Sequence, residues 1–156
     1  MRIDAHCHTN CSDGSVTIEE RIKMIVDLGY KCATITDHDY VSAAQVRAAR
    51  SYAPELDFIS GIELTTSYLG KIVHILGYFV EPENYILQRH IKKTDEIERD
   101  LTRKILKILE QKRKIVIDES ELESDSLHSC HYLNLVKVLA AKLDYDKDKN
   151  FFYYID

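Results

Sequence analysis

The segment TIEERIKMIVDLGYKCATITDHD, residues 17–39, decides the fold class of this chain. Its first part has the apolar spacing of an amphipathic helix, and Thr17 with Glu20 three residues later forms a capping box at its start. Its second part, residues 32–36, is a short strand-like run that leads directly into His38 and the acids beside it. A helix followed at once by a strand is typical of an α/β fold.

The same alternation extends on both sides of this segment. We expect a first strand over residues 1–8, a second helix capped by Ser42 with Gln45 and stopped by Pro54, and strands over residues 56–66 and 71–80. The last two strands are too close in sequence for a helix between them, so they form an antiparallel hairpin. The pattern predicts a parallel or mainly parallel α/β sheet or barrel.

The remainder of the chain, residues 83–156, is predicted to be largely helical. A long helix is expected from residue 83 to about residue 112, and a last helix over residues 131–143. The long helix has an apolar stripe at helical spacing: Ile97, Leu101, Ile105, Ile108 and Leu109. Residues 115–117 are expected to form a short strand, and the aromatic tail at residues 151–155 is expected to contact a partner chain or a second copy.

Composition excludes several classes of protein. The 156 residues carry a net charge of -5, which argues against an extended nucleic-acid surface. The four cysteines form no CxxC pair, which favours reduced thiols over a disulfide scaffold. No signal peptide and no apolar run of membrane-spanning length is present, so we expect a soluble, cytoplasmic protein without membrane contact.

Four strand-associated segments carry residues that bind metals. His6 and His8 lie one residue apart at the end of the first strand and therefore share a face, with Asp13 five residues further on. His38, Glu63 and His74 lie in or after the next three strands. Imidazole mixed with carboxylate suits Zn²⁺, Mn²⁺ or Fe²⁺, so the sequence predicts a metal site at the ends of the strands.

The remaining acids, histidines and cysteines near these segments are not expected to bind the metals. Asp37 and Asp39 turn away from the face of His38, which suits carboxylates that orient an imidazole. His90 is expected to face solvent on the long helix, and Cys7 to point away from the metals. Cys11, Cys32 and Cys130 are expected to be small core or turn residues.

These segments resemble the polymerase-and-histidinol-phosphatase (PHP) domain family. The resemblance rests on four ordered motifs: residues 4–14 (DAHCHTNCSDG), 35–39 (ITDHD), 61–64 (GIEL) and 73–78 (VHILGY). It implies a distorted (β/α)₇ TIM-like barrel with up to three divalent metals, Mn, Zn or Fe, at the carboxyl ends of its strands. It is most similar to the small bacterial phosphoesterases that act on nucleotide bisphosphates or short RNA ends.

By position, the resemblance implies a role for each donor. His6, His8 and Glu63 would hold the first metal, Asp13 and His38 the second, and Glu63 with His74 and a later histidine the third. That later histidine best matches His131. Asp13, His38 and Glu63 would be the catalytic residues.

This sequence departs from the family pattern in two places. No late Asp-x-His motif follows, and no Arg stands shortly before His131, where the sequence reads Ser129–Cys130–His131. We therefore expect residues 1–156 to be an incomplete PHP domain, the N-terminal portion of the barrel.

The expected function is hydrolysis of phosphate esters of nucleotides or short oligonucleotides by a metal-bound hydroxide. One alternative is a catalytically incomplete metal-binding module that needs a partner chain. The other is a histidinol-phosphatase-like phosphomonoesterase, which the compact spacing from His38 to Glu63 to His74 disfavours.

Overall fold

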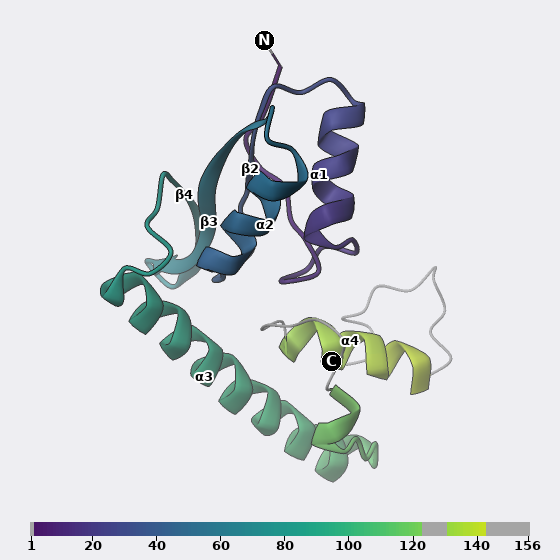
Figure 1. Cartoon of the computed structure of the whole chain (residues 1–156). Helices are drawn as coiled ribbons and strands as arrows, with labels where there is room; N and C mark the ends of the chain where they lie inside the picture. Colours follow the sequence, from purple (N-terminus) through teal and green to yellow (C-terminus); the bar gives the residue numbers. More distant parts are fainter. Residues whose placement is uncertain (1, 123–130, 143–156) are drawn as a thin grey trace. The chain divides into compact units, whose positions relative to one another are not determined.

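The structure is a computed structural model that describes residues 2–122 and 131–142, with residues 131–133 described by their backbone alone. In chain order the main elements are β1 (Ile3–Asp4), α1 (Ile18–Asp27), β2 (Cys32–Ile35), α2 (Ala43–Tyr52), β3 (Asp57–Tyr68), β4 (Lys71–Tyr78), α3 (Tyr85–Ile108) and α4 (His131–Lys142) (Figure 1). A π-helical turn (Leu109–Arg113) and a 3₁₀ turn (Glu119–Leu122) follow α3. The chain divides into two compact units, the first reaching to Asp95 and the second beginning at Glu96.

The first unit contains a four-stranded sheet in the order β1-β2-β3-β4. The strands β1, β2 and β3 are parallel, and β4 pairs with β3 in an antiparallel hairpin, as the sequence predicts. The result is a mixed α/β fold with a curved sheet (Figure 1). The described residues do not close a (β/α)₇ barrel.

The core of the first unit lies between one face of this sheet and the helices α1 and α2. Ile35 of β2 and Ile62 of β3 point to this face and are fully buried against Ile22 and Ile25 of α1. Because side chains of a strand alternate, Gly61 and Glu63 of β3 point to the opposite face. This alternation places the acid of β3 on the side of the sheet away from the helices.

Three expectations about regular structure are wrong. The first strand covers only Ile3–Asp4, because the chain leaves the regular pattern of strand hydrogen bonds after Asp4. The Ala5 oxygen accepts from the Tyr78 hydroxyl at 2.9 Å, and the Cys7 oxygen accepts from the Thr36 N–H at 2.9 Å. Residues 115–117 form no strand, since no strand of the described second unit is available to pair with them. Ile115 and Ile117 pack instead against Leu109 of a small helical core.

The third expectation, the apolar stripe of the long helix, is wrong for three of its five residues. Ile97, Leu101 and Ile108 are 57%, 52% and 50% exposed, whereas Thr102 is buried. Leu109 lies in the core of the second unit, and Ile105 packs against it. That core contains Leu109, Ile117, Leu122, Leu135 and Leu139.

The capping box of α1 forms as predicted. The Thr17 hydroxyl accepts the Glu20 N–H at 3.2 Å, and the Glu20 carboxylate accepts the Thr17 N–H at 2.8 Å. Hydrogen bonds from the Thr17 backbone and side chain lower the pKa of Glu20. The pair therefore closes the first turn of the helix that covers the sheet.

We expect Thr17→Ala to lower the free energy of unfolding by about 1 kcal/mol, because it leaves helix N–H groups without an acceptor. A lowered carboxyl pKa stabilises the folded state above the ordinary pKa of Glu, and this stabilisation is lost as the pH falls through the lowered value. The difference between Thr17→Ala and the unmodified chain should therefore shrink in acid. Urea unfolding at neutral pH and at pH 3 measures it; a difference that grows in acid would contradict the capping role of Glu20.

No helix within the described ranges is long and apolar enough to cross a bilayer.

Candidate metal centre

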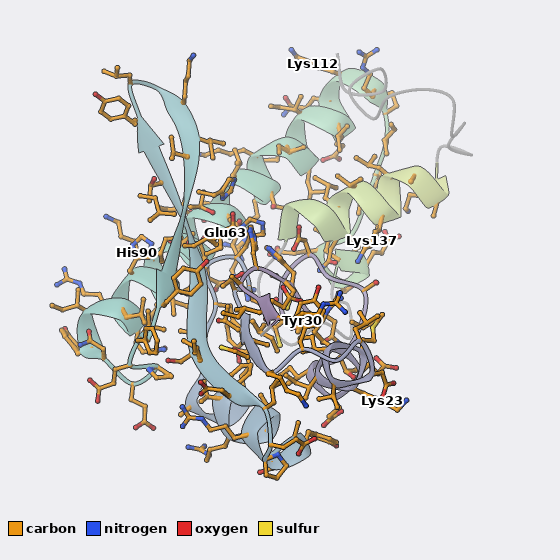
Figure 2. All side chains as sticks on the ribbon, turned by 90° about the horizontal axis from the view of Figure 1, so that it is seen from above. Lys23, Tyr30, Glu63, His90, Lys112 and Lys137 are labelled. Carbon is orange, nitrogen blue, oxygen red and sulfur yellow. The ribbon has the colours of Figure 1, made fainter. Side chains whose placement is uncertain are left out.

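Six metal-binding side chains converge on the face of the sheet opposite the helices. His6 and His8 follow β1, Asp13 lies in the turn before α1, His38 follows β2, and Glu63 and His74 belong to β3 and β4. Figure 2 shows Glu63 on β3 with nitrogen-bearing side chains close beside it. The donors form three overlapping groups, in each of which the donor atoms lie within 4.8 Å of one another.

The tightest group joins His6, His8 and Glu63. The Nε2 atoms of the two histidines are 2.9 Å apart, and they lie 2.9 Å and 3.1 Å from Oε2 of Glu63. The Glu63 side chain is 7% exposed, whereas that of His6 is 46% exposed. The prediction that His6 and His8 share one face is confirmed, although they lie just beyond the strand.

Asp13 lies between two imidazoles. Its Oδ1 is 2.8 Å from Nδ1 of His8, and its Oδ2 is 3.7 Å from Nε2 of His38. Since Nε2 of His8 faces Glu63, the contact with Asp13 uses the other ring nitrogen. A carboxylate that accepts the second N–H of an imidazole orients a histidine whose first nitrogen binds a metal.

Glu63 connects the remaining donors through both of its oxygens. Its Oε2 is 3.8 Å from Nε2 of His38, and its Oε1 is 3.7 Å from Nδ1 of His74. The rings of His38 and His74 pack edge to face with centroids 4.8 Å apart. One carboxylate thus faces four imidazoles.

This donor set fits divalent cations of the Zn²⁺, Mn²⁺ and Fe²⁺ type. With neutral histidines, the two carboxylates give the cluster a charge of about -2, and Glu63 is buried without a lysine or arginine partner among the described residues. A buried charge is costly unless it is paired or binds a metal. Donor atoms roughly 3 Å apart are also the spacing expected around one cation with metal–ligand distances of about 2.1 Å.

The backbone of β3 is held firmly beside Glu63. The Glu63 N–H donates to the Asp37 oxygen at 3.1 Å, and the Glu63 oxygen accepts the Asp39 N–H at 2.8 Å. The carboxylate of Asp39 accepts the Thr65 N–H at 2.9 Å. The segment after β2 therefore continues the ladder past the last residue of the strand and positions His38 opposite Glu63.

The two acids beside His38 do not orient an imidazole of the centre, so that expectation is wrong. Asp37 is fully buried and contacts Thr9, Ser12 and Gln45. Ser42 with Gln45 caps α2 as predicted, because the Gln45 N–H donates to the Ser42 hydroxyl. The Gln45 side chain reaches Asp37.

His90 does not simply face solvent, as the sequence suggested. Its side chain is 42% exposed, yet its Nε2 atom is buried and lies 3.8 Å from Oδ1 of Asp39. The charged neighbours of His90 along α3 gave no signal of this contact.

None of the cysteines that the structure describes belongs to a donor group. The Cys7 thiol donates to the Thr34 oxygen, and burial, followed by the nearby Asp4 charge, raises the pKa of Cys7 to about 12. Cys11 and Cys32 are buried, and burial raises the pKa of each thiol. Cys130 lies outside the described residues.

His131 begins α4, and its side chain lies outside the described residues, as does His128. The assignment of His131 as a ligand therefore stays a prediction.

The sequence did not reveal the roles of three residues. Thr9 and Ser12 donate hydrogen bonds to Asp37, and the Tyr78 hydroxyl donates to the Ala5 carbonyl, directly before His6. The only local signal for Thr9 and Ser12 is their position between His8 and Asp13.

Fold and site together define an α/β protein with a candidate divalent-metal centre at the ends of its strands. A family model described as the PHP domain matches residues 4–127, and the chain belongs to this family.

Named relatives support this membership. The chain is 30% identical over 94 residues to a 3′,5′-nucleoside bisphosphate phosphatase of Chromobacterium violaceum, over 60% of this chain and 33% of the relative. It is 33% identical over 81 residues to a 5′-3′ exoribonuclease of Escherichia coli, over 50% of this chain and 27% of the relative. The matched region thus spans about a third or less of the length of these relatives.

A solved structure of a candidate metal-dependent phosphoesterase from Bifidobacterium adolescentis has the same fold. It superposes with a TM-score of 0.77 at 23% identity, over 92% of this chain and 51% of that one.

Proposed function

We propose that this chain is a divalent-metal-dependent phosphoesterase that acts on phosphate esters of nucleotides or short oligonucleotides. The observation that carries the proposal is the convergence of six donors from separate segments around the buried Glu63. The named relatives act on a nucleoside bisphosphate and on RNA, which supports this substrate class. We also propose that the curved sheet is the N-terminal portion of a distorted (β/α)₇ barrel within one PHP domain.

Each donor has a role in this proposal. His6, His8 and Glu63 would hold one ion, and His38, Glu63 and His74 another, while Asp13 orients His8 and adds an oxygen beside His38. Divalent ions bound there would supply positive charge for phosphate oxygens and lower the pKa of a bound water.

The exposure of the donors supports access by a substrate. Glu63 is buried, but the side chains of His6, Asp13 and His74 are 46%, 43% and 43% exposed. A phosphate group can therefore approach the centre from the side of these three residues. Thr9 and Ser12, in the turn that carries Asp13, are buried.

A metal-binding module without activity is the second candidate. The observation that favours it is that the three donor groups of the described residues share His8, His38 and Glu63. A neutral imidazole binds one ion, so these residues cannot give three ligands to each of three ions. Divalent zinc in catalytic sites is typically held by three protein ligands.

The two candidates are separated by metal content and turnover. The purified chain is analysed for bound metal, and hydrolysis of bis(p-nitrophenyl) phosphate, adenosine 3′,5′-bisphosphate and a 5′-phosphorylated oligonucleotide is followed with added Mn²⁺. We expect bound metal and Mn²⁺-dependent release of product, with the bound metal reduced and the release lost in His74→Ala. Metal binding without turnover of any substrate, at any loading, would leave the module as the function of this chain.

A further inference from the structure

Asp37 is a buried acid that belongs to none of the donor groups. It is 0% exposed and directly precedes His38. Its Oδ1 accepts the Thr9 N–H and the Ser12 hydroxyl, each at 2.7 Å. Its Oδ2 accepts the Thr9 hydroxyl at 2.7 Å and the Gln45 amide at 2.6 Å. All four lone-pair positions of the carboxylate are thus used by donors.

Three of these four hydrogen bonds come from the turn that carries Asp13. The Thr9 oxygen also accepts the N–H groups of Ser12 and Gly14, at 3.1 Å and 2.9 Å. A Cβ atom on Gly14 would lie 2.7 Å from the carbonyl carbon and oxygen of His8 and from the Thr9 oxygen, so the turn is closed tightly upon His8. The turn has no regular structure, and Asp37 provides its link to the end of β2.

We propose that Asp37 is the positioning residue of the Asp13 side of the metal centre. By holding Thr9 and Ser12, it folds residues 9–13 so that Asp13 lies between His8 and His38. The inference rests on the proposed metal centre. Asp37 would act on this centre through the turn, without contact to a metal or a substrate. Gln45 completes the arrangement from α2.

The four donors require a hydrogen-bond acceptor at residue 37. The Thr9 N–H can only donate, whereas the hydroxyls of Thr9 and Ser12 can rotate to accept. The Gln45 side chain can present either its NH₂ group or its oxygen by turning its amide over. Asp37→Ala therefore leaves the buried Thr9 N–H without an acceptor, whereas an asparagine can accept from Thr9 and donate to Gln45.

This geometry also predicts a rescue. In Asp37→Asn, the asparagine oxygen can accept from the Thr9 N–H and the Ser12 hydroxyl, while its NH₂ group donates to the Thr9 hydroxyl oxygen and to the Gln45 side-chain oxygen. Val46→Ala, next to Gln45 on the same helix, is the control for lost stability, because Val46 packs in the helix-facing core.

Two measurements test the inference. The first is Co²⁺ binding, followed by titration and by the visible spectrum of the bound ion. The second is the rate of amide hydrogen exchange at residues 9–14 in the metal-free chain. We expect Asp37→Ala to weaken Co²⁺ binding by roughly 10–100-fold, to change its spectrum and to speed the exchange. Asp37→Asn should recover binding to within a few-fold. Val46→Ala should lower the melting temperature without changing affinity.

Two results would overturn the inference: exchange of residues 9–14 and Co²⁺ binding unchanged in a folded Asp37→Ala, or a loss of affinity that Val46→Ala reproduces at equal melting temperature. Failure of the unmodified chain to bind Co²⁺ while Asp37→Ala still speeds the exchange would instead refute the proposed metal centre, and with it any role of Asp37 in binding.

Discussion

Replacing Glu63 by Gln is expected to remove more bound metal than replacing any single histidine. Oε2 of Glu63 faces His6, His8 and His38, and Oε1 faces His74. A glutamine keeps only one of these oxygens, so at least one donor group loses its carboxylate in either orientation of the amide. A neutral imidazole has a single free nitrogen lone pair and so binds one ion.

We expect Glu63→Gln to reduce Mn²⁺ affinity by about 100-fold or more, beyond the 10–100-fold typical of groups that only support a ligand. Isothermal titration gives the affinity and the number of ions, with His6→Ala and His74→Ala as single-ligand comparisons. Glu55→Gln, an exposed position after α2, makes the same change of charge away from the site. Equal losses in Glu63→Gln and the histidine variants would contradict a shared carboxylate.

The second large effect is expected at the neighbouring residue, on the opposite face of the same strand. Ile62 is 0% exposed and packs in the core beneath α1 and α2. Ile62→Ala leaves a cavity there and should lower the free energy of unfolding by about 2–5 kcal/mol, whereas Ile62→Val should cost about 0.5–1.5 kcal/mol. Urea unfolding followed by circular dichroism measures both.

Ile62→Ala and Glu63→Gln together test the alternation of faces along β3. Below its melting temperature, Ile62→Ala should bind Mn²⁺ with the stoichiometry of the unmodified chain, because no donor of the centre lies on the core face. Glu63→Gln should instead lose metal and keep its circular dichroism spectrum. Loss of metal in a folded Ile62→Ala would show that core and centre are not separated in this way.

Much of the first unit could be predicted from local patterns. The capping box of α1, the strand at residues 32–35 and the antiparallel hairpin of β3 and β4 all form as the sequence indicates. Each depends on contacts between residues close in sequence or on the alternation of side chains along a strand. His6, His38 and Glu63 come together because the parallel strands β1, β2 and β3 bring their carboxyl ends to one edge, and the antiparallel hairpin places His74 opposite Thr65, close to Glu63.

By itself, then, the sequence determined which side chains can bind a metal and which strands carry them. Only the tertiary structure decided the partners of Asp37, the side-chain contact of Gln45 and the contact of His90 with Asp39. The hydrogen bonds between Thr9 and Asp37 join residues 28 positions apart, in segments without regular structure. No periodicity records such a contact, because it exists only when packing has brought a turn and a strand end together.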